Sequence, residues 1–219
     1  MTVETLNFLL GLGQNNNREW FEKNKPTYEK VYKKEFTPFI QDLIDEVKKF
    51  DPSVNDLAKD SLFRIYRDVR FAKDKSPYKD HFSASISKGG KKNPDYPGYY
   101  IQLSGGMLMI GGGAYFLEKD KLFKARQHIL NNQNAFMELI AQPDFITHFE
   151  AVKGEKNVRI EQEFKEISDK VPLIMNKQFY VMAELDPNLA IGENAVRAVA
   201  KYCEVMKPFN DFFAEGAFF

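Results

Sequence analysis

Residues 64–79 hold the densest group of chemically versatile side chains in this 219-residue sequence. The segment reads Arg-Ile-Tyr-Arg-Asp-Val-Arg-Phe-Ala-Lys-Asp-Lys-Ser-Pro-Tyr-Lys. Between Arg64 and Lys92 there are nine Lys or Arg residues against three Asp, a net charge of +6 in a chain whose formal net charge is zero. This segregation of charge predicts a patch that faces anions on an otherwise mildly acidic protein.

Alternation along an extended strand would divide this segment into two faces. One face is apolar apart from Arg67, whose charge could not be buried without a partner. We therefore expect Arg67 to be largely buried beside a carboxylate or several carbonyl groups. The other face places Arg64 and Arg70 on either side of Asp68, an arrangement suited to phosphate or carboxylate. A structural ion-pair network has the same composition and is favoured almost equally.

The sharpest hypothesis is a pocket that binds an anion. Asp68 and Asp74 hold its basic groups in place, and Tyr78 supplies a hydroxyl donor after Pro77 ends the strand. The start of the second helix forms the opposite wall, because helix N-termini favour anions. The predicted ligand-binding residues are Arg64, Arg67, Asp68, Arg70, Lys73, Asp74, Lys75, Tyr78, Asn16, Asn17 and Arg18. These residues identify neither the ligand nor a reaction, and no residue is assigned a catalytic role.

The middle of the chain has the two-residue period of β-strands. The predicted strands are Phe63–Phe71, Phe82–Ser87, Tyr99–Ser104 and Met107–Phe116. Gly105-Gly106 is a two-residue hairpin turn, and the glycines at 111–113 indicate a bulge or a close backbone approach. Val158–Phe164 and Gln178–Met182 are short candidates for edge strands.

Both ends of the chain have helical periodicity. Asn16 and Glu19 have the spacing of a capping box, and Pro26 suits the first turn of a helix. Helices are expected at Thr2–Leu12, from Asn16, from Pro26 to the stripe ending at Val47, and at Glu118–Asn131, Asn134–Ala141 and Gly192–Phe213. Helices at both ends of a run of antiparallel strands predict an α+β fold. We expect residues 1–219 to form a single domain, with the terminal helices covering one face of the sheet.

Composition argues against several classes of protein. The single cysteine, Cys203, allows no intramolecular disulfide, and His81, His128 and His148 lack ligand spacing, so we expect no metal site. His81 is interpreted as an exposed histidine at a strand entry rather than an acid–base group. No phosphate-loop or dinucleotide fingerprint is present, and no cofactor is expected. No apolar run is long enough to span a bilayer and the N-terminus lacks a signal-peptide pattern, which predicts a cytoplasmic protein without membrane partners.

Two blocks of the sequence form a recognisable pair. They are Asn-Asn-Asn-Arg-Glu-Trp-Phe at 15–21 and Arg-x-x-Arg-Asp-x-Arg-Phe-x-Lys-Asp-Lys-x-Pro-Tyr-Lys at 64–79. Together with Gly-Tyr-Tyr at 98–100 before a Gly-rich hairpin, they resemble the conserved bacterial family called domain of unknown function 2461. The resemblance spans essentially the whole chain. It implies no established activity, and it supports the charged residues of the second block as candidates without assigning them roles.

Three functions fit these observations, in descending order of preference. The first is binding of an anionic small molecule, such as a phosphorylated metabolite or nucleotide, with or without catalysis. The second is a nucleic-acid-associated module that uses the basic strand and the loop at 88–92 for phosphates and Tyr66, Tyr78, Tyr96 or Tyr99 for stacking. The third is a structural or interaction domain whose charged motif is an ion-pair hub. A concave pocket favours a small ligand, and an open stripe favours nucleic acid.

Overall fold

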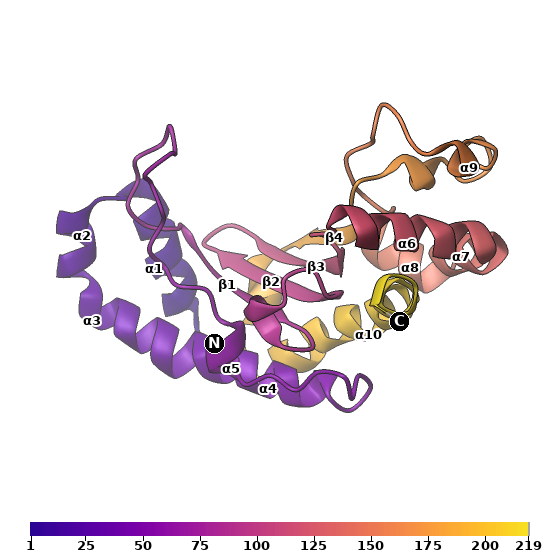
Figure 1. Cartoon of the computed structure of the whole chain (residues 1–219). Helices are drawn as coiled ribbons and strands as arrows, with labels where there is room; N and C mark the ends of the chain where they lie inside the picture. The colour runs from indigo at the N-terminus through magenta and orange to yellow at the C-terminus, as the bar shows by residue number, and fades with distance from the viewer. Residues whose placement is uncertain (219) are drawn as a thin grey trace.

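The computed structural model describes residues 1–218 and has an α+β fold, as the sequence predicts. Its centre is a four-stranded antiparallel sheet in the order β1-β2-β3-β4 (Figure 1). The strands are β1 (His81–Ile86), β2 (Gly98–Ser104), β3 (Leu108–Ala114) and β4 (Phe179–Leu185). Gly105 and Gly106 turn the chain between β2 and β3, and the Ser104 N–H donates to the Met107 carbonyl at 2.9 Å. The predicted hairpin is therefore confirmed.

The predicted strand Phe63–Phe71 is wrong. Only its start follows the sheet, where Leu62 pairs with β1 and the Phe63 N–H donates to the Ser83 carbonyl at 3.0 Å. The chain then leaves the sheet and returns at β1, forming a projection that we call the basic arm (residues 64–79; Figure 1). A longer strand would have carried charged side chains into the sheet, and desolvating such groups is costly.

The fourth position in the sheet belongs to β4. This confirms the predicted strand at 178–182, which extends to Leu185. The other proposed edge strand, Val158–Phe164, is wrong, because the chain runs there into the short helix α9 (Gln162–Lys165). Phe164 is buried in the core, and a short segment with one buried aromatic is compatible with either element, so periodicity alone could not decide.

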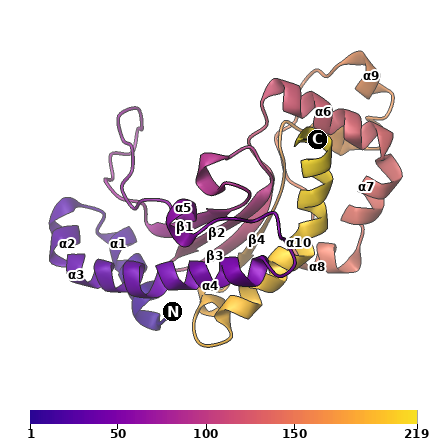
Figure 2. The same cartoon turned by 60° about the horizontal axis from the view of Figure 1, so that its bottom comes forward.

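One face of the sheet is covered by helices, as expected. Along β2 the buried side chains are Tyr99, Ile101 and Leu103, which alternate with half-buried ones. Helix α10 (Ala195–Phe218) packs on β3, and α4 (Thr37–Val47) packs against α10 (Figure 2). A Cβ atom at Gly112 would lie 1.9 Å from the Gly98 carbonyl oxygen and 2.5 Å from the Met206 sulfur. The predicted close backbone approach is thus confirmed, and glycine is what permits it.

The other helices come before and after the sheet in the chain. The N-terminal set is α1 (Val3–Gln14), α2 (Arg18–Lys23), α3 (Lys25–Tyr28), a π-helical stretch (Glu29–Phe36) and α5 (Ala58–Ser61). The C-terminal set is α6 (Lys119–Asn131), α7 (Gln133–Ile140) and α8 (Pro143–Phe149). Short 3₁₀ stretches occur at Gly90–Lys92, Pro172–Met175 and Pro187–Ala190. None of the helices in residues 1–218 combines the length and apolar character needed to cross a membrane.

The starts of α2 and α3 lie close to the positions that the sequence predicts. Its N-cap is Asn17, one residue later than the predicted Asn16, and the Asn17 side chain accepts a hydrogen bond from the Trp20 N–H at 2.9 Å. Pro26 lies in the first turn of α3, as predicted. These helices lie next to the basic arm (Figure 1).

Candidate functional site

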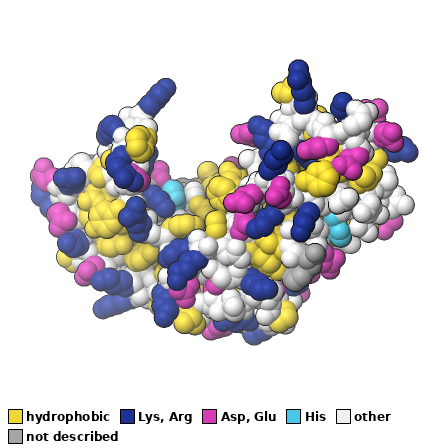
Figure 3. All heavy atoms as spheres, in the orientation of Figure 1, with side chains coloured by type: hydrophobic (Ala, Val, Ile, Leu, Met, Phe, Trp, Pro, Cys, Tyr) yellow, Lys and Arg dark blue, Asp and Glu magenta, His cyan; other side chains and the backbone are white. Residues whose placement is uncertain are grey.

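The uncovered face of the sheet lies at the bottom of a hollow. The basic arm rises on one side of it, and α6 and α9 rise on the other (Figure 1). The space-filling view shows hydrophobic side chains on the floor of this hollow and charged side chains on both walls (Figure 3). Strand residues on this side are half-buried, among them Tyr100, Met109 and Met182. We call this surface the open face.

The outgoing and returning segments of the basic arm are tied together near its base. The Arg67 N–H donates to the Pro77 carbonyl at 3.0 Å, and the Lys79 N–H donates to the Ile65 carbonyl at 2.8 Å. The Arg67 side chain forms an ion pair with Asp74 across the arm. The expected carboxylate partner is therefore present, but the Arg67 side chain is 29% exposed and thus half-buried rather than largely buried. An arm outside the sheet has no apolar face on which to bury it.

The second arginine–aspartate pair lies further along the arm. The Nε and Nη2 atoms of Arg70 donate to the two carboxylate oxygens of Asp68 at 3.0 and 2.6 Å. These bonds hold the pKa of the Asp68 carboxyl below its usual value, and the bond from Arg67 likewise lowers the pKa of the Asp74 carboxyl. Lys75 donates to the Val69 carbonyl at 2.9 Å. Both aspartates thus hold basic groups in place, in the way that the sequence hypothesis requires of them.

Tyr78 is positioned by packing. It is 4% exposed, and its ring stacks on Phe21 with centroids 4.0 Å apart. The Asn16 side chain clamps its backbone, donating to the Tyr78 carbonyl at 2.9 Å and accepting from the Tyr78 N–H at 3.1 Å. Burial raises the pKa of the Tyr78 hydroxyl, and the neighbouring charge of Arg18 opposes that shift. Asn16, Asn17 and Arg18 therefore lie beside the base of the arm, the first as a clamp and the second as a helix cap.

Arg64, Lys73, Lys75 and Lys79 have no carboxylate partner within residues 1–218. Two of them lie at the base of the arm: Arg64, which is exposed, and Lys79, which is half-buried. The ammonium of Lys79 lies 5.0 Å from the centre of the Phe63 ring. Burial lowers the pKa of Lys79, and the positive charge of Arg64 lowers it further. Arg64 and Lys79 are therefore neighbours, and we call them the cation pair.

Lys79 is the residue that the sequence interpretation missed. It belongs to the basic segment, but the predicted ligand-binding residues of that segment end at Tyr78. Lys73, at the tip of the arm, also has no hydrogen bond or ion pair within the described part of the chain. Phe71 is 96% exposed there. The tip and the cation pair are thus two separate positive features of one segment.

Aromatic rings continue from the cation pair across the open face. The Phe63 and Tyr100 ring centres are 6.5 Å apart. Burial raises the pKa of Tyr100, and the nearby Tyr115 hydroxyl raises it further. Tyr115 in turn contacts Tyr180 at 5.0 Å and Phe116 at 4.8 Å between ring centres. We call these five residues the aromatic row. Two tyrosines that the sequence suggested for stacking, Tyr78 and Tyr99, are buried and therefore unavailable.

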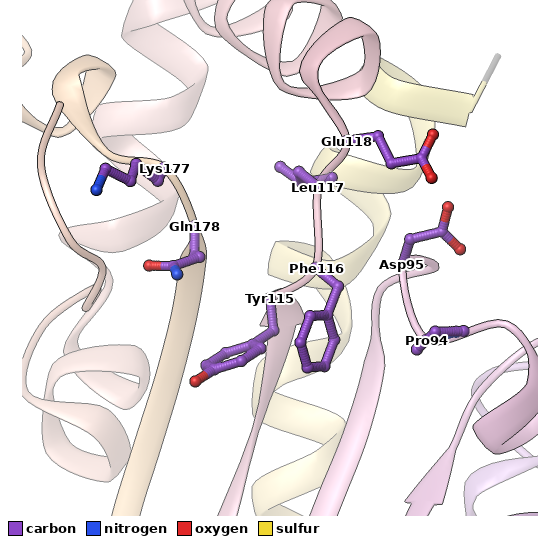
Figure 4. Close-up of a pocket in the computed structure, with 8 residues that line it drawn as sticks. All are labelled: Pro94, Asp95, Tyr115, Phe116, Leu117, Glu118, Lys177 and Gln178. Carbon is purple, nitrogen blue, oxygen red and sulfur yellow. The ribbon is translucent and has the colours of Figure 1, made fainter. Parts of the chain in front are cut away.

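The aromatic row ends at an open pocket of about 540 Å³, where β3 leads into α6. Its walls come from three segments, and the lining residues are Pro94, Asp95, Tyr115, Phe116, Leu117, Glu118, Lys177 and Gln178. Figure 4 shows the rings of Tyr115 and Phe116 between Lys177 and Gln178 on one side and Asp95 and Glu118 on the other. The sequence did not point to this pocket, because its residues are far apart in the chain.

His81 begins β1, as the predicted strand-entry histidine does, and its Nδ1 lies 2.9 Å from Asp80 Oδ1. Its side chain is 21% exposed and therefore half-buried, so the predicted exposure of His81 is wrong. In residues 1–218, no three His, Cys, Asp or Glu side chains are grouped so that they could hold a metal ion.

The fold and this surface define the class: an α+β protein with an open antiparallel sheet and a basic arm at its edge. A family model described as "Conserved hypothetical protein (DUF2461)" matches residues 4–212 of the 219. The chain belongs to this family, which confirms the resemblance seen in the sequence. Searches of curated proteins and of solved structures found no match.

Proposed function

We propose that this protein binds a phosphorylated small molecule that carries a planar ring, such as a nucleotide, on the open face. The phosphate lies between Arg64 and Lys79, and the ring lies over Phe63 and Tyr100. The observation that carries the proposal is the cation pair: two neighbouring positive side chains without a carboxylate partner in the described chain.

Electrostatics explains why such a pair favours an anion. Like charges disfavour each other's charged form, and partial burial of Lys79 adds a desolvation cost. A phosphate carries up to two negative charges and several acceptor oxygens, so it offsets both costs at once. Arginine offers a planar fork of donors to such a group, and lysine adds a point charge.

The nearest aspartates do not compete for this role. Both oxygens of Asp68 already accept from Arg70, and Asp74 is engaged by Arg67 and by the Ser76 hydroxyl at 2.6 Å. The internal ion pairs of the arm thus leave the cation pair available. The proposed site differs from the pocket that the sequence suggests, in which Arg70, Lys73 and Lys75 contact the ligand directly. The two sites predict different effects of substitutions in the arm.

The test is a thermal-shift screen with inorganic phosphate, sulfate, nucleoside monophosphates and sugar phosphates. A ligand that binds only the folded state raises the melting temperature by mass action. We expect nucleoside monophosphates to shift the wild type and to lose the shift in Arg64→Ala/Lys79→Met. Each charge-assisted contact contributes about 1.5–3 kcal/mol, so the double change weakens binding by roughly 100-fold or more.

The matched control is Lys73→Ala, which removes an exposed cation at the tip of the arm. It should keep the full shift. A wild type that responds to no phosphorylated compound, or a double variant that responds equally, would leave the ion-pair hub as the better account. A shift lost in Lys73→Ala but kept in the double variant would favour the site at the tip of the arm.

A further inference from the structure

The pocket at the far end of the aromatic row is left unexplained by a ligand that ends over Tyr100. Tyr115 and Phe116 are 45% and 59% exposed, which is unusual for two adjacent large aromatic side chains. Their rings meet edge to face at 4.8 Å. They lie at the base of the pocket in Figure 4, so a flat ring placed there would contact both.

The polar groups of this pocket differ in kind from the cation pair. Asp95 is engaged by Lys121, and Lys177 pairs with Glu155 at 3.3 Å. The carboxylate of Glu118 makes no hydrogen bond or ion pair within residues 1–218 and is a vacant acceptor. The amide oxygen of Gln178 accepts from the Glu155 N–H at 3.0 Å, so its amino group remains as a donor.

These groups select against a phosphate and for an uncharged ring. A carboxylate in the pocket wall repels a second anion, whereas it accepts hydrogen bonds from amino or hydroxyl groups. A nucleobase offers such an amino edge together with two flat faces for stacking, and base–aromatic stacking is tolerant of sequence. The charge of the open face is therefore polarised, with an anion site at the arm and a neutral ring site at the pocket.

We propose that the ligand is a short single-stranded nucleic acid with a terminal phosphate, held by the cation pair at one end and by Tyr115 and Phe116 at the other. This inference rests on the proposed function, because it uses the same phosphate site and the same row of rings. It extends the ligand from one nucleotide to a strand that crosses the sheet.

The dimensions of the sheet agree with a few nucleotides. The path from the cation pair to the pocket is diagonal: it crosses about three strand spacings, roughly 14 Å, and also runs along the strands from the level of Ser83 to beyond Ala114. A stacked strand advances about 3.4 Å per nucleotide, so at least about four nucleotides are needed to span it. Phe63, Tyr100 and Tyr115 lie along this path, so ring contacts are available between the two ends.

The experiment is isothermal titration with adenosine monophosphate and with 5′-phosphorylated di- and tetra-adenylates, in ribose and deoxyribose forms. We expect the wild type to bind the tetranucleotide at least tenfold more tightly than the mononucleotide. Tyr115→Ala/Phe116→Ala should remove this gain while leaving mononucleotide affinity unchanged. Both side chains are largely exposed, so the variant should fold, which a thermal melt verifies.

Phe71→Ala provides the matched control, because Phe71 is an exposed aromatic outside the row. It should leave both affinities unchanged. The inference would be overturned if the tetranucleotide bound no more tightly than the mononucleotide, or if its tighter binding survived the Tyr115/Phe116 change. Neither result would contradict the mononucleotide site. If the mononucleotide itself does not bind, or binds independently of Arg64 and Lys79, the proposed function fails first and the inference fails with it.

Discussion

At the scale of single residues, the basic arm contains both paired and unpaired cations, and the proposed phosphate site uses two of the unpaired ones. Arg67 and Arg70 are each neutralised by an aspartate, whereas Arg64 and Lys79 are not. Lys79 is also half-buried against Phe63. A half-buried charge without a carboxylate partner reduces the stability of the folded state. Its retention is understandable if the charge serves binding.

This reasoning predicts that Lys79→Met makes the protein more stable at neutral pH. Burial and Arg64 place the folded-state pKa of Lys79 below its unfolded value. Between those two values the unfolded chain binds more protons, so wild-type stability rises as pH rises through that window. The stability advantage of Lys79→Met should therefore shrink as pH increases towards the ordinary lysine pKa. Urea unfolding of both proteins between pH 7 and pH 10 measures it.

Ligand binding should have the opposite pH dependence. Loss of the Lys79 proton removes half of the cation pair, so nucleotide affinity should fall as pH rises through the lowered pKa of Lys79. The Lys79→Met variant should lack this dependence. A variant that is less stable than wild type at pH 7 would mean that Lys79 has a stabilising partner, which contradicts the reasoning.

At the scale of elements, the glycines of β3 allow α10 to approach the sheet closely. The atoms nearest to a Cβ at Gly112 are the Gly98 carbonyl oxygen and the Met206 sulfur, and the carbonyl belongs to the paired strand. At Gly112 the absence of a side chain lets Met206 of α10 approach the backbone of β3. The covered face therefore depends on Gly112 as much as on its apolar residues.

We predict that Gly112→Ala destabilises the protein by about 1–3 kcal/mol, as overpacking does. For a chain of this size that lowers the melting temperature by roughly 2–12 °C. The matched control is Gly106→Ala in the hairpin turn, where a Cβ would meet nothing within 4 Å. Calorimetry should show little change for the control. Equal melting temperatures for both variants would mean that α10 can shift to accommodate the methyl group.

At the scale of the whole molecule, the net charge of zero conceals a positive segment of +6. In the fold this segment does not coat the protein. Most of its charges lie in an arm beside a neutral, aromatic floor, and acidic groups line the pocket beyond (Figure 3). For the proposed nucleic-acid ligand, electrostatic attraction is therefore local, and only a few phosphates are neutralised.

Because few phosphates are neutralised, binding of the tetranucleotide should depend only weakly on salt concentration. If two cations neutralise phosphates of a single strand, the logarithm of affinity falls with the logarithm of salt concentration with a slope of about −1.4. Between 50 and 200 mM salt the tetranucleotide should bind roughly sevenfold more weakly. Fluorescence titrations in that range provide the measurement. A slope several times steeper would mean that the tip of the arm also contacts phosphates, as the sequence hypothesis proposes.

Local patterns in the sequence were enough for much of the fold. The α+β class, the hairpin at Gly105-Gly106, the strand at 178–182 and the close approach at the glycines of 111–113 all follow from period and turn chemistry. The segment Phe63–Phe71 was misassigned because its alternation imitates a strand. No neighbouring strand offers partners for the charged side chains of this segment. The pattern within the segment cannot show this, because it depends on other parts of the chain.

For the candidate site as well, the sequence predicted one part and only the tertiary structure decided the rest. Residue types and spacing were sufficient to single out residues 64–79 as a positive segment and to suggest that Asp68 and Asp74 hold arginines. Only the tertiary structure shows that Lys79 lies near Arg64 and that Tyr115, which follows β3, lies near Tyr100 of β2. Charge and period are properties of neighbouring residues in the chain. Whether a charge is paired, and which rings share a surface, depends on contacts between segments that folding alone brings together.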